Sequence, residues 1–67
     1  MTELERVLME RDNMTREEAK QLILDAYLDI YNYTSADELM ADWFGLEPDY
    51  ICDLIEVAGT KIKVGIA

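Results

Sequence analysis

The strongest hydrophobic pattern in the chain is an apolar stripe from Ala19 to Tyr31, and it predicts a helix over about residues 16–32. Its side chains recur at intervals of three and four residues, which is the spacing of one face of an α-helix. Leu24 and Leu28 lie beside this stripe and widen it, so we expect a central helix that other elements touch on more than one side. The stripe consists of Ala19, Leu22, Ile23, Ala26, Tyr27, Ile30 and Tyr31.

Capping boxes precede this segment and two others. In a capping box, the side chain of Ser or Thr accepts a hydrogen bond from the backbone amide three positions on, and the Glu side chain at that position accepts one from the backbone amide of the Ser or Thr. The boxes fall at residues 2–5, 15–18 and 35–38. They predict a short first helix that ends near residues 12–13, the central helix, and a third helix whose apolar residues end at Gly45. Pro48 suits the start of a fourth helix, which we expect to reach Gly59.

Apolar and polar or small residues alternate in the last segment, residues 61–66, and this pattern is typical of a strand. A single strand must pair with a second copy, with a partner's sheet, or with residues 55–57; the alternative is a flexible tail. We therefore expect a mainly α protein, a small bundle of three to four short helices with a short C-terminal β-strand. It forms one helical domain over residues 1–67, with 58–67 as the strand or tail.

A chain of 67 residues buries little surface, so it gains from a disulfide, a metal or a second copy. Cys52 is the only cysteine and there is no histidine, which excludes an intrachain disulfide and a tetrahedral zinc site. Self-association remains, and we expect a homodimer or a bound partner. The sequence shows neither a secretion signal nor an apolar run long enough to span a bilayer, so we expect a cytoplasmic protein that does not bind membranes.

Charge is distributed unevenly along the chain. The net charge is −9, which argues against direct binding to nucleic acid. Residues 21–60 contain nine acidic side chains and no lysine or arginine. One interpretation is a solvated face that keeps the protein soluble. The other is a surface for a basic partner, since carboxylates four residues apart on a helix lie about 6 Å apart, close to successive phosphates.

The candidate partner-binding residues are therefore mainly carboxylates. Tyr33 falls off the central stripe, so we expect it to be exposed, and exposed aromatic side chains often anchor interfaces. The complete candidate set is Asp25, Asp29, Asp37, Glu38, Asp42, Asp49, Asp53, Glu56 and Tyr33.

Catalysis and cofactor binding have little support. The chain lacks histidine and a glycine-rich phosphate loop, and we expect Cys52 to be a half-buried structural residue. Residues 29–40 have the length of a calcium loop, but Thr34 replaces its glycine and Met40 its glutamate. We therefore predict no enzyme activity, no cofactor and no metal site.

The segments Met14-Thr15-Arg16-Glu17-Glu18-Ala19 and Trp43-Phe44-Gly45-Leu46-Glu47-Pro48-Asp49-Tyr50 resemble short uncharacterised acidic proteins of phages and prophages. The resemblance covers about residues 12–56 and implies a phage-type accessory protein in the bacterial cytoplasm; it transfers no functional residue. Together with the acidic segment, it leads us to expect an inhibitor or modulator that binds a basic surface of a host protein, for example a nucleic-acid-binding enzyme, by nucleic-acid mimicry or in an anti-defence role. The alternative is a homo-oligomer that sequesters a small molecule or signal nucleotide with the segregated basic residues.

Overall fold

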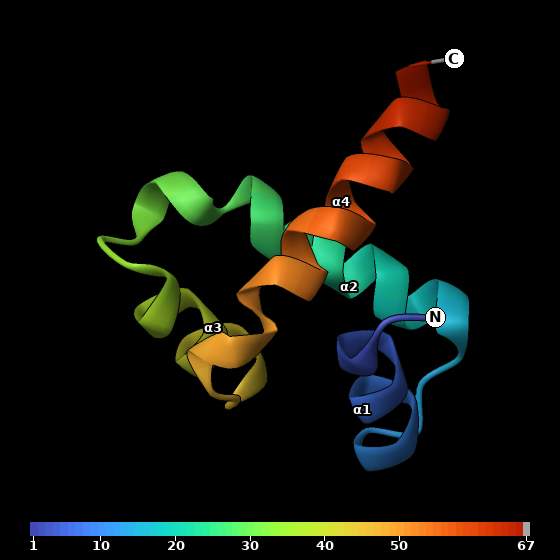
Figure 1. Ribbon diagram of the computed structural model, residues 1–67, viewed down its shortest axis with the longest axis horizontal. Coiled ribbons are helices and arrows are strands. Elements are labelled where there is room, and N and C mark those ends of the chain that lie inside the picture. Colours follow the sequence, from blue (N-terminus) through green and yellow to red (C-terminus); the bar gives the residue numbers. More distant parts are fainter. Residues whose placement is uncertain (67) are drawn as a thin grey trace.

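The computed structural model describes the backbone of residues 1–66 and the side chains of residues 1–62. Four α-helices follow one another: α1 (Glu3–Arg11), α2 (Arg16–Leu28), α3 (Ala36–Phe44) and α4 (Ile51–Ile66) (Figure 1). The short 3-10 helices η1 (Ile30–Asn32) and η2 (Pro48–Tyr50) precede α3 and α4. The expected small bundle of helices is confirmed.

The helix starts follow the capping signals. The Thr2 and Thr15 side chains each accept a hydrogen bond from the backbone amide three residues on, and the Glu5 and Glu18 carboxylates accept one from the backbone amides of Thr2 and Thr15. At α3 only the first half of the box forms, with Ser35 accepting from the Glu38 amide. These caps set where α1, α2 and α3 begin, and Gly45 ends α3 in the left-handed conformation with φ 65°.

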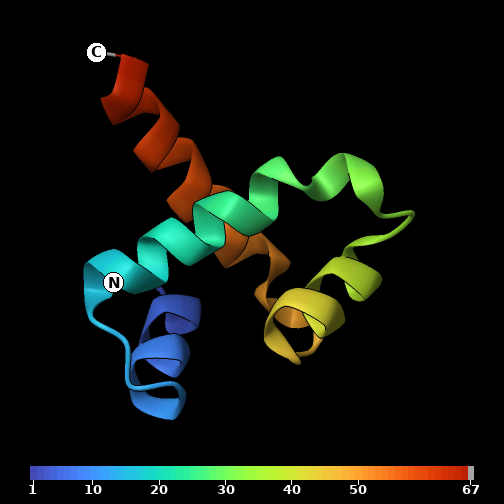
Figure 2. The same ribbon diagram turned by 180° about the vertical axis from the view of Figure 1, so that it is seen from behind.

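The core lies where α2 crosses α4, and these two helices make the most extensive contact in the molecule. The crossing is visible from both sides, with α1 and α3 on opposite sides of it (Figures 1 and 2). The molecule measures 31 × 27 × 15 Å. Figures 1 and 2 look down the shortest axis from opposite sides, and α4 lies in front of α2 in the first and behind it in the second, so the bundle is two helices thick at the crossing. The buried apolar residues are Leu4, Leu8, Ala19, Ile23, Ala26, Leu39, Met40, Phe44, Leu54, Val57 and Ala58.

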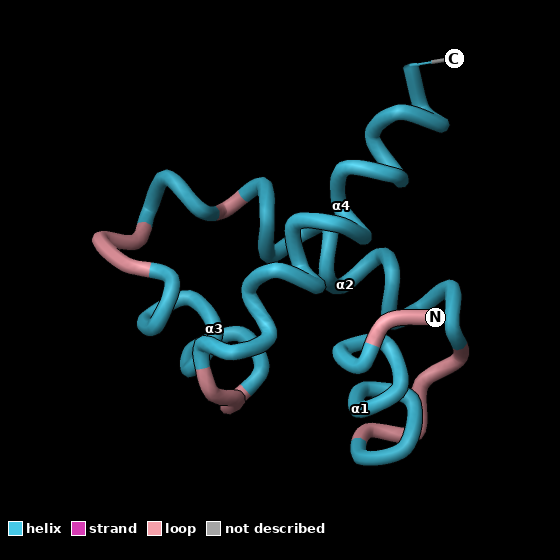
Figure 3. Tube along the Cα trace, in the orientation of Figure 1, coloured by secondary structure: helices cyan, strands magenta, loops and turns pink. Residues whose placement is uncertain are grey.

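The predicted C-terminal strand is wrong. Within residues 1–66 every regular element is helical (Figure 3), and α4 continues through Gly59 to Ile66. Two physical reasons explain the error. A helix satisfies its own backbone hydrogen bonds, whereas a strand at this position needs a partner. Ile62 also lies four and eight residues after Ala58 and Leu54, so it continues the helical spacing of the fourth helix as well as an alternating one.

The central helix is shorter than the expected 16–32. It ends at Leu28, and Asp29 joins it to η1. The tighter 3-10 turn rotates the residues that follow, because its side chains advance by three residues per turn. Tyr31, which the stripe places inward, is 95% exposed, whereas Tyr33 is half-buried against the core. The expectation that Tyr33 is the exposed tyrosine is therefore wrong.

Among the described residues, no helix combines the length and apolar character that crossing a membrane requires.

Candidate functional site

All ion pairs between described side chains lie at one end of the molecule. Every basic residue with a described side chain is paired, and every acidic partner lies between Glu3 and Glu17. The pairs are Arg6–Glu3, Arg6–Glu10, Arg11–Asp12, Arg16–Glu5, Lys20–Glu17 and Lys61–Glu17. In the sequence, residues 1–20 and 61–67 hold six acidic and six basic side chains, which cancel. The whole net charge of −9 therefore belongs to residues 21–60.

Within this middle segment, three of the candidate carboxylates accept hydrogen bonds that hold the fold together. Asp29 accepts from the Trp43 indole nitrogen at 3.2 Å, which connects the end of α2 to α3. Asp53 accepts from the backbone nitrogen of Leu4 at 3.2 Å and so fixes the first turn of α1 to α4. Both carboxylates are half-buried, so their first role is structural.

Asp42 accepts a hydrogen bond from the Tyr33 hydroxyl. This bond favours the neutral phenol, and together with burial and the negative charges of Asp42 and Asp29 it raises the pKa of Tyr33 to about 12. The Tyr33 side chain thus connects the loop before α3 to the exposed side of that helix.

The exposed carboxylates of residues 21–60 form what we call the acidic surface. The Asp25 carboxylate accepts from the side-chain amide of Gln21 at 3.0 Å. In the described part of the chain, none of these carboxylates takes part in an ion pair. The acidic surface consists of Asp25, Asp37, Glu38, Asp42, Glu47, Asp49 and Glu56.

The structure corrects the position of one candidate and adds another residue. Pro48 begins η2, and α4 begins at Ile51, so Asp49 lies in η2 and not in the fourth helix. Glu47 was not among the candidates, although it lies in the same segment without cations and is exposed. The composition of residues 21–60 could have identified Glu47 as a candidate, whereas the spacing of residues along a helix could not.

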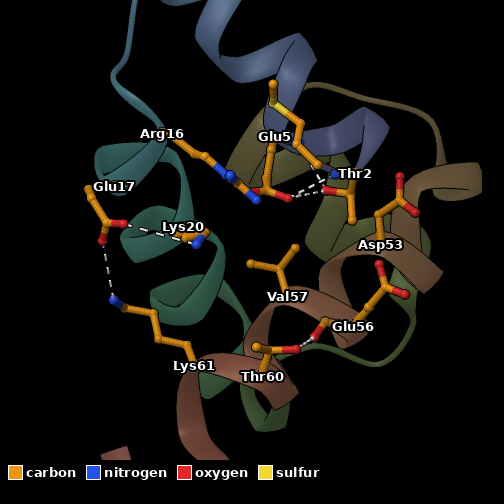
Figure 4. Close-up of a pocket in the computed structure, with 11 residues that line it drawn as sticks. Thr2, Glu5, Arg16, Glu17, Lys20, Asp53, Glu56, Val57, Thr60 and Lys61 are labelled. Atoms are coloured by element: carbon orange, nitrogen blue, oxygen red, sulfur yellow. Dashed lines mark hydrogen bonds and ion pairs between the residues drawn. The ribbon is translucent and has the colours of Figure 1, made fainter. Parts of the chain in front are cut away.

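A pocket of about 620 Å³ lies between the N-terminus, α2 and α4 (Figure 4). Lys20 and Lys61 reach it from opposite ends of the sequence, and each lies 4.0 Å from Glu17. Asp53 and Glu56 form the facing wall. The sequence did not reveal this pocket, because it depends on the crossing of α2 and α4.

Glu5, which lines this pocket, is the only buried charged residue among the described side chains, with 2% of its surface exposed. Its carboxylate accepts from the backbone nitrogen and the hydroxyl of Thr2, each at 2.9 Å, and from Arg16 Nε at 3.0 Å. Burial raises the pKa of Glu5, but these hydrogen bonds and the Arg16 charge outweigh it, so the pKa lies below its usual value. Glu5 is therefore charged and connects α1 to α2 through its ion pair with Arg16.

Cys52 is exposed, which corrects the expectation of a half-buried residue. No group of three or more potential metal-ligating side chains comes together among the described residues.

The chain matches no protein-family model, no curated protein and no solved structure.

Proposed function

We propose that this protein binds a basic surface of another protein through its acidic surface and so blocks or modulates that partner. One observation supports the proposal above the others. The basic side chains of the described region are all paired at the α1 end, while the carboxylates of the acidic surface have no cationic partner there. A net charge of −9, all of it contributed by residues 21–60, attracts a basic surface over distances of a Debye length, about 10 Å at 0.1 M salt.

The partner's identity follows from chemistry and from the resemblance. A surface that attracts carboxylates in place of phosphates belongs most simply to a protein that binds nucleic acid. The resemblance to phage proteins implies that the partner is a host protein and that the binding is a form of inhibition or anti-defence.

The test is affinity capture from bacterial lysate at two salt concentrations with three forms of the protein. The acidic-surface variant carries Asp37→Asn, Glu47→Gln and Asp49→Asn, none of which has a side-chain hydrogen bond in the described part of the chain. The control variant changes Glu3, Glu10 and Asp12 to their amides, which alters the net charge equally at the other end. Three exposed charges at about 0.5 kcal/mol each correspond to roughly a tenfold loss of affinity.

We expect the native chain to capture a nucleic-acid-binding protein in low salt and to lose it in high salt. The acidic-surface variant should lose that partner, and the control variant should keep it. Added DNA should displace the captured protein. An equal loss in both variants would show that only total charge matters, and the proposal would then be wrong.

The pocket favours a second candidate, binding of a small anionic molecule. Arg16, Lys20 and Lys61, three of the six basic residues, converge on it within one chain. Against this candidate, the facing carboxylates repel an anion, and Glu17 already occupies both lysines. Mass spectrometry of small molecules released from the purified chain tests it. An anionic metabolite that is released from the native chain and absent after Lys20→Gln would support this candidate over the first.

A further inference from the structure

Helix α4 has an apolar side that the described chain leaves largely open: Cys52, Ile55 and Gly59 are exposed, and Ile62 is half-buried. Leu54 and its neighbours on the inward side are buried against α2, but the outward side is open, and Ile55 keeps 50% of its surface exposed. The last turns of α4 extend past α2 with no other element beside them in either ribbon view (Figures 1 and 2). We call this outward side the α4 seam; it consists of Cys52, Ile55, Gly59 and Ile62.

The seam residues are separated by three, four and three positions. This is the spacing of the a and d positions in the heptad repeat, by which one helix packs its side chains against another helix of the same spacing. Residues on any one face of a helix share this spacing, so the distinguishing feature of the seam is that a largely open face is uncharged. The seam carries no charged residue, although 31% of the chain is charged.

Gly59 provides a second, independent observation. A Cβ atom added there would meet nothing within 4 Å in the chain, and the residue is part of the continuous helix α4. A glycine inside a helix costs about 1 kcal/mol relative to alanine. Neither the packing within the chain nor the backbone conformation requires it. A close approach by a second backbone does, because glycine is the residue that permits it.

We propose that α4 pairs antiparallel with α4 of a second copy of this chain, with the two helices crossing near Gly59. Charge favours this direction. Asp53 and Lys61 face the pocket, where they contact Leu4 and Glu17, so they do not bear on the seam. Glu56 directly follows the seam residue Ile55, and Lys63 directly follows Ile62. Parallel pairing would place the two copies of Glu56 together. Antiparallel pairing that crosses near Gly59 sets the Glu56 position of each chain opposite the Lys63 position of the other, and it opposes the two helix dipoles.

A second copy also supplies what the single chain lacks. The molecule is 15 Å across in its shortest dimension, so its own core is thin. Chains of this size commonly gain stability by oligomerisation. In the antiparallel pair, the projecting half of each α4 lies over the exposed half of the other, and the buried Ile55 and Ile62 side chains extend the core across the interface. The proposal does not depend on the acidic surface having a partner.

Molar mass in solution, measured by light scattering over a range of concentrations, tests the pairing. We expect twice the chain mass of 7.7 kDa. Ile55→Asp should raise the dissociation constant at least tenfold and yield single chains. Because Ile55 is half-exposed in the chain itself, this variant should keep its helical circular dichroism. The control is Thr60→Asp, which adds the same charge at an exposed α4 position outside the seam and should leave the mass doubled.

Single chains at every concentration would overturn the proposal, and so would a dimer that survives Ile55→Asp. Dissociation by Thr60→Asp as well would show that charge and not the seam controls the mass.

The exposed Cys52 tests whether the two α4 helices pair antiparallel or parallel. Antiparallel helices that cross near Gly59 hold the two Cys52 residues about 20 Å apart along the axis, beyond the reach of a disulfide. Mild oxidation should therefore leave the dimer without an interchain disulfide, while rapid disulfide formation would overturn the antiparallel arrangement.

Discussion

The buried Glu5 carboxylate offers the sharpest test of how this bundle is held together. Glu5→Gln keeps the size of the side chain and one acceptor oxygen, which can still accept from Thr2. In the native chain the Glu5 carboxylate accepts a hydrogen bond from Arg16 Nε at 3.0 Å. In the variant the new amide NH₂ group, a donor, faces this Arg16 donor, so the bond is lost. A hydrogen bond to a charged group contributes about 1.5–3 kcal/mol. The Arg16 side chain is 50% exposed, so water takes over part of its contact, and the expected loss is about 1–2 kcal/mol.

This loss is large for a protein of this size. At 0.05–0.15 kcal/mol per residue, the whole free energy of unfolding is roughly 3–10 kcal/mol. Urea denaturation followed by circular dichroism measures the loss, at one fixed protein concentration so that self-association does not alter the comparison. Glu10→Gln is the matched control, since it makes the same chemical change in α1 at a side chain that is 70% exposed. It should change the free energy of unfolding by less than about 0.5 kcal/mol.

The loss should also depend on pH. The pKa of Glu5 in the folded protein lies below its ordinary value of 4.5. Its stabilisation is therefore fully present above pH 4.5 and is lost as the pH falls through the lower, folded-state pKa. The difference between the native chain and Glu5→Gln should shrink in acid. Equal stability of the two at neutral pH, or a difference that does not change in acid, would refute the assigned role of Glu5.

Three more changes have defined outcomes. Gly45→Ala should lower the free energy of unfolding by about 1–2 kcal/mol, measured by thermal unfolding. The φ angle at Gly45 is 65° and an added Cβ meets no neighbour, so the loss comes from backbone strain alone. An unchanged free energy of unfolding would refute that strain. Trp43→Phe removes the donor to Asp29 and should lower the free energy of unfolding by about 1 kcal/mol; an unchanged urea midpoint would show that this bond is dispensable. Tyr33→Phe should remove a tyrosinate titration near pH 12 from the ultraviolet absorbance. Because the pKa of Tyr33 is raised in the folded protein, the stabilisation from this tyrosine is fully present below pH 10.0 and is lost as the pH rises toward 12. A Tyr33 that ionises near pH 10.0 would contradict the hydrogen bond to Asp42.

The helix starts were predictable because their signals are local. A capping box lies within four residues, and at Thr2 and Thr15 the structure forms both of its hydrogen bonds. The end of α2 was not predictable in the same way. Nothing in the stripe marks Asp29 as a break, because the bond that holds it comes from Trp43, fourteen residues later in the chain. That break moves Tyr31 outward and Tyr33 inward, which is why the exposed tyrosine was misidentified.

The tail shows how two periods can share one sequence. Residues 61–66 alternate, as a strand does, but Ile62 also continues the spacing of Ile55 and Gly59. A short segment gives periodicity too few positions to decide between the two. The absence of a strand partner among the described residues decides it, and that is a property of the fold. The candidate site shows the same division, since composition located the acidic segment, but only the fold shows that Asp29 and Asp53 are occupied by internal donors.

The two proposed interactions bear on each other through geometry. The α4 seam and the acidic surface share no residue, so Ile55→Asp tests one without neutralising the other. In an antiparallel pair the starts of the two α4 helices lie at opposite ends, and so do the acidic residues of α3 and η2 that precede them, which limits repulsion between two molecules of charge −9. Such a pair also presents two acidic surfaces at once. A target with two basic sites at matching separation would then be held more tightly than by one chain, because the second contact forms within the complex. Loss of capture by Ile55→Asp, with the acidic surface intact, would therefore identify a target that binds both chains of the pair.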